Sequence, residues 1–234
     1  MTTIRTLAET GSTNADLLLL AREGAAEGTW LRAERQTAGR GRQGRQWASP
    51  AGNCYASTLI RLRPSDPPAA TLALTAAIAL HEAVAVYCDS PIRLKWPNDL
   101  LLDGAKLSGI LLERAGDAVV IGFGVNLAHH PQGLERAATS LAEHGMSIDP
   151  AMFVETLAES VARWLSRWRG EGIAPIRSRW LACAHPPGTA LTARTSDGAS
   201  VDGLFDGLDG DGALILRLAS GERHVIHAGD VFLI

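Results

Sequence analysis

Three short apolar segments separated by tight turns constrain the fold of this chain more than any other feature. They run over residues 92–96, 106–114 and 118–126, and the dipeptides Asp103-Gly104 and Gly116-Asp117 precede the second and third. Such dipeptides between strand-forming segments favour hairpins, in which consecutive strands pair antiparallel. The middle of the chain is therefore predicted to form a mainly antiparallel sheet.

Helical patterns occur on both sides of this region. Residues 14–24 follow the cap-forming Ser12 and Thr13 and end at a glycine, and residues 69–87 have the apolar pattern of a buried helix. The fold class is therefore α+β, a sheet with flanking helices. Further strands are expected over 29–35 and 54–63, and further helices over 140–144, 151–169 and 173–184.

The pattern changes after His185-Pro186-Pro187-Gly188. Beyond this point, short strand-like segments are interrupted by turn signals at residues 196–198, 209–212 and 220–222. Closely spaced strands without a helix predict a small all-β unit of about 50 residues. The expected domains are residues 1–184 and residues 185–234.

Composition and charge exclude several classes of protein. Hydrophobic residues make up 46% and charged residues 20% of the 234 residues, and no apolar run is long enough to cross a bilayer. The N-terminal segment lacks the features of a secretory signal, and three separated cysteines give no disulfide framework. A net charge of -3 argues against a dedicated nucleic-acid-binding protein. We expect a cytoplasmic protein with no membrane and no DNA partner.

A loop rich in glycine and arginine, residues 36–53, follows one of the predicted strands. Within it, Gly39-Arg40-Gly41-Arg42-Gln43-Gly44 satisfies the GxGxxG pattern of dinucleotide-binding folds. That motif requires a helix directly after it, whereas a strand follows here. The arginines instead indicate a mobile flap that closes over phosphates, although composition alone favours a solvated basic loop.

Three further motifs place polar groups or glycines on strands. Lys95-Trp96-Pro97-Asn98-Asp99 ends a strand, Lys106 opens the apolar segment KLSGILLE, and Gly122-Phe123-Gly124-Val125-Asn126 places glycines inside a strand. Taken singly, each motif has an ordinary structural explanation, namely a turn, a lysine at a sheet edge and a β-bulge. A functional site becomes the better interpretation only when the motifs are taken together.

Together with Ser12-Thr13-Asn14, these motifs closely resemble the biotin–protein ligase family in order and spacing. The combination of GRGRQGR with KWPND is highly specific, and the resemblance covers essentially the whole chain. It implies a mixed sheet with flanking helices, like the class II aminoacyl-tRNA synthetase and lipoate ligase core, followed by a small C-terminal SH3-like β-barrel. Bifunctional members carry an N-terminal helix-turn-helix. Because Ser12 lies so near the start of this sequence, a monofunctional ligase without repressor function is expected.

The resemblance also implies a reaction. Biotin is activated by ATP and Mg²⁺ to biotinyl-5'-AMP, and the biotinyl group passes to a lysine of an apo biotin carboxyl carrier protein, a subunit or domain of biotin-dependent carboxylases such as acetyl-CoA carboxylase. Cations must offset the charge that develops between a carboxylate and a phosphate. The expected catalytic residues are Lys106, Arg40, Arg42 and Asp99.

The expected binding residues form two overlapping sets. For biotin they are Ser12, Thr13, Asn14, Gln36, Gly39, Arg40, Gly41, Arg42, Lys106, Gly109, Gly122 and Gly124, with Ile110 beside them. For ATP they are Arg40, Arg42, Trp47, Lys95, Asn98, Asp99, Lys106 and Asn126. Asp99 is also a weak candidate metal ligand, with magnesium held mainly by the ATP phosphates.

Several alternatives stay open at this point. A lipoate ligase shares the adenylation chemistry, although its family lacks the GRGRxGR loop. An RNA-binding module could use the arginines, although the net charge and the few aromatic residues disfavour it. His129-His130 could bind a metal, yet no third ligand is apparent. Both a monomer and a homodimer are compatible with the sequence.

Overall fold

The computed structural model describes residues 3–133, 136–195 and 198–234. Its larger part is a seven-stranded sheet in the order β1-β2-β3-β7-β6-β5-β4. Neighbouring strands pair antiparallel except β1 and β2, which are parallel, so the predicted mixed sheet is confirmed. The strands are β1 (Ile4–Thr10), β2 (Trp30–Gln36), β3 (Cys54–Arg61), β4 (Ile92–Lys95), β5 (Asp99–Leu102), β6 (Ala105–Ala115) and β7 (Ala118–Val125).

Two strands of this sheet were not predicted from the sequence. β1 is an edge strand whose side chains are all exposed or half-buried, so its sequence lacks the apolar alternation of a core strand. β5 has four residues and begins at Asp99, which the sequence favours as part of a turn. A turn at the cis peptide bond Trp96-Pro97 joins β4 to β5, and Lys95 pairs with Asp99 across that hairpin.

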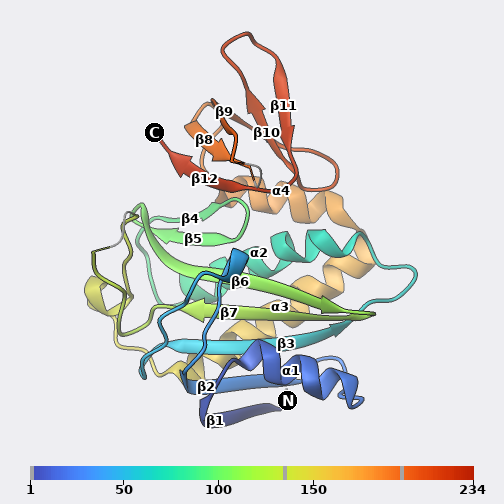
Figure 1. The fold of residues 1–234 in the computed structure, drawn as a ribbon, viewed down its shortest axis with the longest axis vertical. Coiled ribbons are helices and arrows are strands. Elements are labelled where there is room, and N and C mark those ends of the chain that lie inside the picture. Colours follow the sequence, from blue (N-terminus) through green and yellow to red (C-terminus); the bar gives the residue numbers. More distant parts are fainter. Residues whose placement is uncertain (1–2, 134–135, 196–197) are drawn as a thin grey trace.

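Helices cover both faces of the sheet (Figure 1). α1 (Thr13–Arg22) packs on one face against Leu59 and Val120, while α2 (Leu72–Ala85) and α3 (Pro150–Glu171) pack together on the other. Asp149 caps α3 by accepting a hydrogen bond from the backbone N–H of Ala151 at 2.7 Å. The remaining helical segments are α4 (Ile173–Cys183) and the 3₁₀ turns η1 (Arg42–Gly44), η2 (Ala69–Thr71) and η3 (Ala142–His144).

The C-terminal part forms a separate five-stranded antiparallel sheet in the order β11-β10-β9-β8-β12. It lies above α4 in Figure 1 and confirms the predicted small all-β unit. The indole N–H of Trp96 donates to the carbonyl of Gly212 at 3.1 Å and so joins the two sheets. The boundary at residue 185 stays a prediction, and Ser196 and Asp197 of one predicted turn lie outside the described residues. The strands are β8 (Ala190–Arg194), β9 (Ser200–Leu208), β10 (Leu214–Arg217), β11 (Arg223–Ile226) and β12 (Asp230–Leu233).

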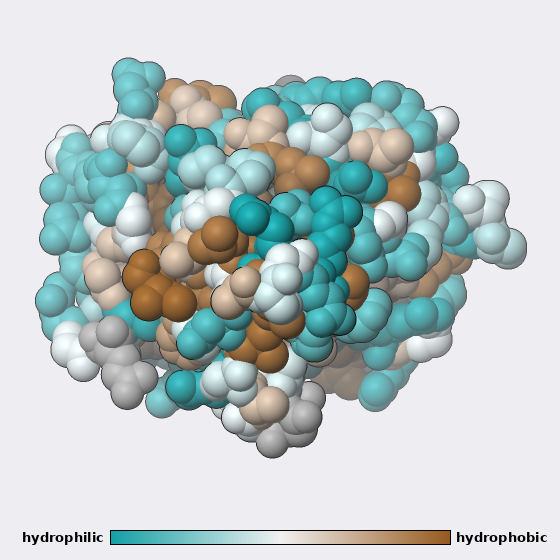
Figure 2. All heavy atoms as spheres, turned by 90° about the horizontal axis from the view of Figure 1, so that it is seen from above, coloured by the Kyte–Doolittle hydropathy of each residue, from teal (hydrophilic) through white to brown (hydrophobic). Residues whose placement is uncertain are grey.

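The face seen from above carries mostly hydrophilic residues, with hydrophobic residues in small separate areas (Figure 2). Exposed apolar side chains of the C-terminal sheet include Val225, Leu233 and the terminal Ile234. Within the described ranges, none of the helices combines the length and apolarity needed to cross a bilayer.

Candidate active site

A cavity of about 730 Å³ opens where glycines replace side chains on the α1 face of the sheet. Val120 lies under α1, and two and four residues further along the same face of β7 stand Gly122 and Gly124. Gly109 of β6 pairs directly opposite Gly124, so neighbouring strands lack side chains at the same place. The loop at residues 40–48 and residues of β8 and β12 complete the walls.

The cavity brings together nearly all of the residues predicted for the site. The exception is Gly39, which is tightly packed inside the loop: a Cβ atom there would lie 2.6 Å from the Ser49 hydroxyl and from the Trp47 carbonyl oxygen. The predicted residues that line the cavity are Ser12, Thr13, Asn14, Gln36, Arg40, Gly41, Arg42, Trp47, Lys95, Asn98, Asp99, Lys106, Gly109, Ile110, Gly122, Gly124 and Asn126.

One side of the cavity is lined by Thr13, Asn14 and Gln36, and the buried Ser57 is hydrogen-bonded to the first two. We call these four neutral polar residues the amide cluster. The buried Ser57 hydroxyl lies 2.7 Å from the Thr13 hydroxyl and donates to Asn14 Oδ1 at 2.6 Å. Gln36 Oε1 accepts from the backbone N–H of Thr13 at 2.9 Å, and Gln36 Nε2 donates to Ser49. These hydrogen bonds fix the side-chain orientations before any ligand is bound.

Glycine at position 122 is required by Asn14. A Cβ atom at Gly122 would lie 2.1 Å from Asn14 Oδ1, so the amide packs directly on the backbone of β7. Asn14 Nδ2 donates to Glu113 Oε2 at 2.8 Å and to the Leu111 carbonyl oxygen at 3.3 Å. Gly122 also lines the cavity, so its predicted contact with biotin stays a prediction.

The indole of Trp47 covers the other two glycines. A Cβ atom at Gly124 would lie 2.6 Å from the indole ring, and one at Gly109 would lie 3.2 Å from it. The ammonium of Lys106 lies 5.5 Å from the ring centroid. Trp47 Nε1 is buried and has no hydrogen-bond partner among the described residues, so this N–H group is available to an acceptor on a ligand.

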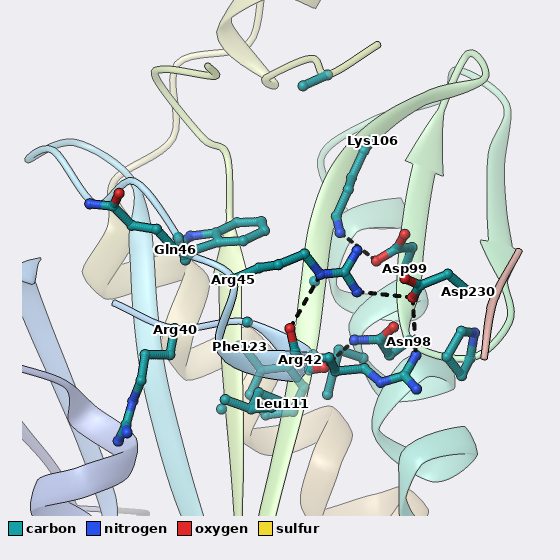
Figure 3. A pocket seen from close by; sticks show the side chains of 18 of the residues that line it. Arg40, Arg42, Arg45, Gln46, Asn98, Asp99, Lys106, Leu111, Phe123 and Asp230 are labelled. Atoms are coloured by element: carbon teal, nitrogen blue, oxygen red, sulfur yellow. Dashed lines mark hydrogen bonds and ion pairs between the residues drawn. The ribbon is translucent and has the colours of Figure 1, made fainter. Parts of the chain in front are cut away.

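Four cationic side chains and two carboxylates form the second side of the cavity, the cationic cluster: Lys95, Lys106, Arg42 and Arg45 with Asp99 and Asp230. Figure 3 shows all of them except Lys95 with labels. Lys106 Nζ lies 2.6 Å from Asp99 Oδ1, and Lys95 Nζ lies 3.5 Å from Asp99 Oδ2. Burial lowers the pKa of Lys95, and the charge of Asp99 opposes this shift. Asp99 is therefore the shared counter-ion of two lysines.

The loop at residues 40–48, which we call the arginine loop, contacts the C-terminal sheet. Arg45 donates to Asp230 Oδ1 at 2.9 Å, and Arg42 donates to the Gly229 carbonyl oxygen at 3.0 Å. Burial raises the pKa of Asp230, but the hydrogen bond from Arg45 and the charges of Arg45 and Arg42 outweigh it and leave the pKa below its usual value. Residues from both sheets thus build the cationic cluster.

Arg40 differs from the other arginines of the loop. Figure 3 shows its side chain pointing away from Arg42, Arg45 and Lys106. Its guanidinium lies 4.0 Å from Glu113, the carboxylate that also accepts from Asn14. Glu113 is therefore placed between the amide cluster and the arginine loop.

The side chains of the site do not form a binding site for a magnesium ion coordinated by the protein. Both oxygens of Asp99 face ammonium groups, and the described part of the chain contains no group of three or more His, Cys, Asp or Glu side chains that could hold a metal. For the alternative at His129-His130, the His130 ring contacts Ser140, Gln132 and Glu143. We therefore do not assign Asp99 as a magnesium ligand.

Several functional candidates were missed by sequence reasoning. Ser57 belongs to the amide cluster, Glu113 accepts a hydrogen bond from Asn14, and further residues line the cavity, namely Asp230, Arg136, Arg194 and Phe232. Both Arg136 and Arg194 lie over the Phe232 ring. A buried serine inside an apolar strand was a usable signal for Ser57. The residues of β8 and β12 carry no such signal, because only the packing of the two sheets brings them to the cavity.

The chain matches two families along its length. Residues 9–126 match the biotin/lipoate A/B protein ligase family, and residues 190–234 match the biotin protein ligase C terminal domain. It is 46% identical to a biotin--[acetyl-CoA-carboxylase] ligase from Paracoccus denitrificans over 241 aligned residues, which cover 97% of this chain and 98% of that protein. The chain belongs to the biotin–protein ligase family.

Solved structures of biotin–protein ligases share this fold. The Aquifex aeolicus enzyme in complex with biotin and ATP has a TM-score of 0.89 and 25% identity, with all of both chains covered. The Leishmania major enzyme in complex with biotinyl-5-AMP has a TM-score of 0.67 and 26% identity, covering 97% of this chain and 99% of that one. The RNA-binding alternative is therefore set aside, and the match of the C-terminal domain favours a biotin ligase over a lipoate ligase.

Proposed function

We propose that this ligase joins biotin to ATP as biotinyl-5'-AMP, with release of pyrophosphate, and then transfers the biotinyl group to a lysine of an apo biotin carboxyl carrier domain. The observation that carries the proposal is the cavity itself, which places a neutral amide cluster next to a cationic cluster. Gly122 lies against Asn14 of the amide cluster and Gly124 lies against Trp47, and the two glycines are two residues apart on one strand, a spacing of about 7 Å.

The amide cluster suits the ureido ring of biotin. That ring has N–H donors and one carbonyl acceptor, and recognition of such a group requires a few oriented polar groups within apolar walls. Ser12, Thr13 and Gln36 line this part of the cavity, and Leu111 and Ile110 supply apolar walls. Asn14 contributes by fixing the shape of the cavity wall, since its amide is hydrogen-bonded to Ser57 and Glu113.

The cationic cluster suits the reacting ends of the two substrates. A carboxylate and the α-phosphate of ATP repel each other, and further charge develops in the transition state. Lys106 offers a preorganised cation, and Arg42 lines the cavity from the loop with a charge that suits phosphate oxygens. Arg40 lines the cavity too, but it faces Glu113 and would have to turn to reach the phosphates. Trp47, Asn98 and Asn126 form the nucleotide side, where Asn98 and Asn126 are themselves fixed by hydrogen bonds to the carbonyl oxygens of Ile110 and Thr139.

Magnesium would enter with ATP and neutralise phosphate charge, and no protein ligand is needed for that role. The enzyme also needs no nucleophile of its own, because the acceptor lysine attacks the adenylate. Cys54 fits this view: burial raises the pKa of its thiol to about 12, so it is not a reactive cysteine.

The direct test is mass spectrometry of the protein after incubation with biotin and MgATP. A retained biotinyl-5'-AMP, and labelling of an added apo carrier domain on one lysine, are the expected results. Substituting lipoate for biotin is the control. Formation of lipoyl-adenylate in preference to biotinyl-adenylate would contradict the proposed substrate.

A further inference from the structure

The chain contains almost no side-chain amines. Lys95 and Lys106 are the only lysines among its 22 Lys and Arg residues. Both line the same cavity, and both contact the same carboxylate, Asp99. The other residues in this group are arginines, whose guanidinium groups stay protonated at neutral pH. Both side-chain amines of the chain therefore lie next to the proposed reaction centre.

This arrangement poses a chemical problem for the enzyme. Biotinyl-5'-AMP is a mixed anhydride that acylates lysine: a neutral amine attacks the carbonyl carbon and an amide bond forms. The bond from that carbon to the phosphate oxygen breaks, AMP leaves, and the amine releases a proton. An ammonium group has no lone pair for this attack. With Lys106 at the carboxylate–phosphate junction, as proposed above, its nitrogen would be the amine nearest to the activated carbonyl.

We propose that Asp99 protects the enzyme from acylation by its own intermediate, by holding Lys95 and Lys106 as protonated, ion-paired ammonium groups. Lys106 can then act as a cation towards the adenylate without becoming its acceptor. Asp99 is a positioning residue in this account, and the inference rests on the proposed location of Lys106.

The geometry supports this role for Asp99. Each carboxylate oxygen faces one lysine, at 2.6 Å from Lys106 and 3.5 Å from Lys95, and the Asp99 side chain is only 6% exposed. Its backbone is fixed in β5 between Lys95 on β4 and Gly109 on β6. The strand pairing fixes the Asp99 backbone, and the two ion pairs hold its carboxylate between the lysines.

The neighbours of Lys95 show why a counter-ion is needed. Burial lowers the pKa of its ammonium, and the positive charges of Arg136 and Lys106 lower it further. Asp99 opposes these effects through its charge and a hydrogen bond. Without the carboxylate, this buried amine would lose its proton more readily and gain the lone pair that acylation requires.

The test uses synthetic biotinyl-5'-AMP at concentrations that saturate each variant, followed by peptide mass spectrometry. Asp99→Asn keeps the side-chain shape and removes the charge. We expect it to acquire a biotinyl group on Lys106 or Lys95 at least about tenfold faster than wild type, because both amines lose the carboxylate with which they are paired. Adding Lys106→Arg or Lys95→Arg identifies the labelled amine. Asp117→Asn, which removes an exposed carboxylate paired with Arg61, is the matched control.

A second variant tests whether an unpaired amine in this cavity is acylated at all. Arg136 lines the cavity and has no ion-pair partner among the described residues, so Arg136→Lys should be labelled at position 136. Arg167→Lys, on the exposed surface of α3, is its control. Labelling of Asp99→Asn at the wild-type rate would overturn the proposal, as would an unlabelled Arg136→Lys. Because the adenylate is supplied, these outcomes are distinct from a failure of wild type to form it from biotin and MgATP.

Discussion

The amide cluster and the cationic cluster line the same cavity but differ in how their side chains are held. Both contain buried members, namely Ser57 and Asn14 in the first and Lys95 and Asp99 in the second, whereas the Lys106 and Arg45 side chains of the second are 30% and 49% exposed. The first cluster is held by hydrogen bonds, one of them to the Glu113 carboxylate, and the second is held by ion pairs to Asp99 and Asp230. The difference indicates a preformed site for the neutral end of biotin and a set of paired charges for the reacting ends.

The largest expected effect comes from removing the central cation. Lys106→Ala should fold normally and lose about 10² to 10³ in the rate of adenylate formation, because one preorganised charge opposite a developing anion is commonly worth that much. Pyrophosphate release measures the rate. Arg114→Ala, from the same strand but outside the cavity, is the control. Near wild-type release by Lys106→Ala would remove Lys106 from the mechanism.

A glycine substitution breaks the amide cluster instead. Gly122→Ala places a methyl group against Asn14 Oδ1, so the asparagine must move. Overpacking of this kind costs roughly 1–3 kcal/mol, and we expect the KM for biotin to rise by about 10- to 100-fold while the KM for ATP changes little. Gly11→Ala, where a Cβ atom meets nothing within 4 Å, should be neutral. Equal changes in both KM values would show that the two clusters are not separable.

Substitutions of Glu113 test the link between Asn14 of the amide cluster and Arg40 of the loop. Glu113→Ala removes the acceptor of Asn14 and the ion-pair partner of Arg40, and we expect the KM for biotin to rise by about 5- to 10-fold. Glu113→Gln keeps an oxygen that can accept from Asn14, so it should restore most of the biotin affinity. Glu155→Ala on α3 is the control. If Gln is as damaging as Ala, the charge facing Arg40 matters more than the hydrogen bond.

The smallest expected effect is at the contact between the loop and the C-terminal sheet. Asp230→Asn weakens the hold on Arg45 and Arg42, and we expect limited proteolysis within residues 39–49 to become about 2- to 5-fold faster. The lowered pKa of Asp230 means that its carboxylate is charged above its ordinary pKa near 4 and that the contact is lost only at lower pH. The difference between variant and wild type should therefore be constant from pH 6 to pH 8.

The sequence by itself determined the family, the α+β class and most of the cavity lining. Motifs such as GRGRQGR and KWPND combine residue types that charge stabilisation and tight backbone packing require, and they lie close together along the chain. Local patterns also predicted α1, α3 and the hairpin of β6 and β7, because apolar periodicity and turn residues act over short distances.

Only the tertiary structure decided how those residues are held. The partners of Asn14 are Ser57 and Glu113, which are 43 and 99 residues away, and Asp230 reaches Arg45 from 185 residues away. β1 and β5 were missed because an exposed edge strand and a four-residue strand gain their stability from pairing with neighbours rather than from their own pattern. Sequence patterns report local preference, whereas the pairing of Asp99 with two lysines depends on strand register, which the whole sheet sets.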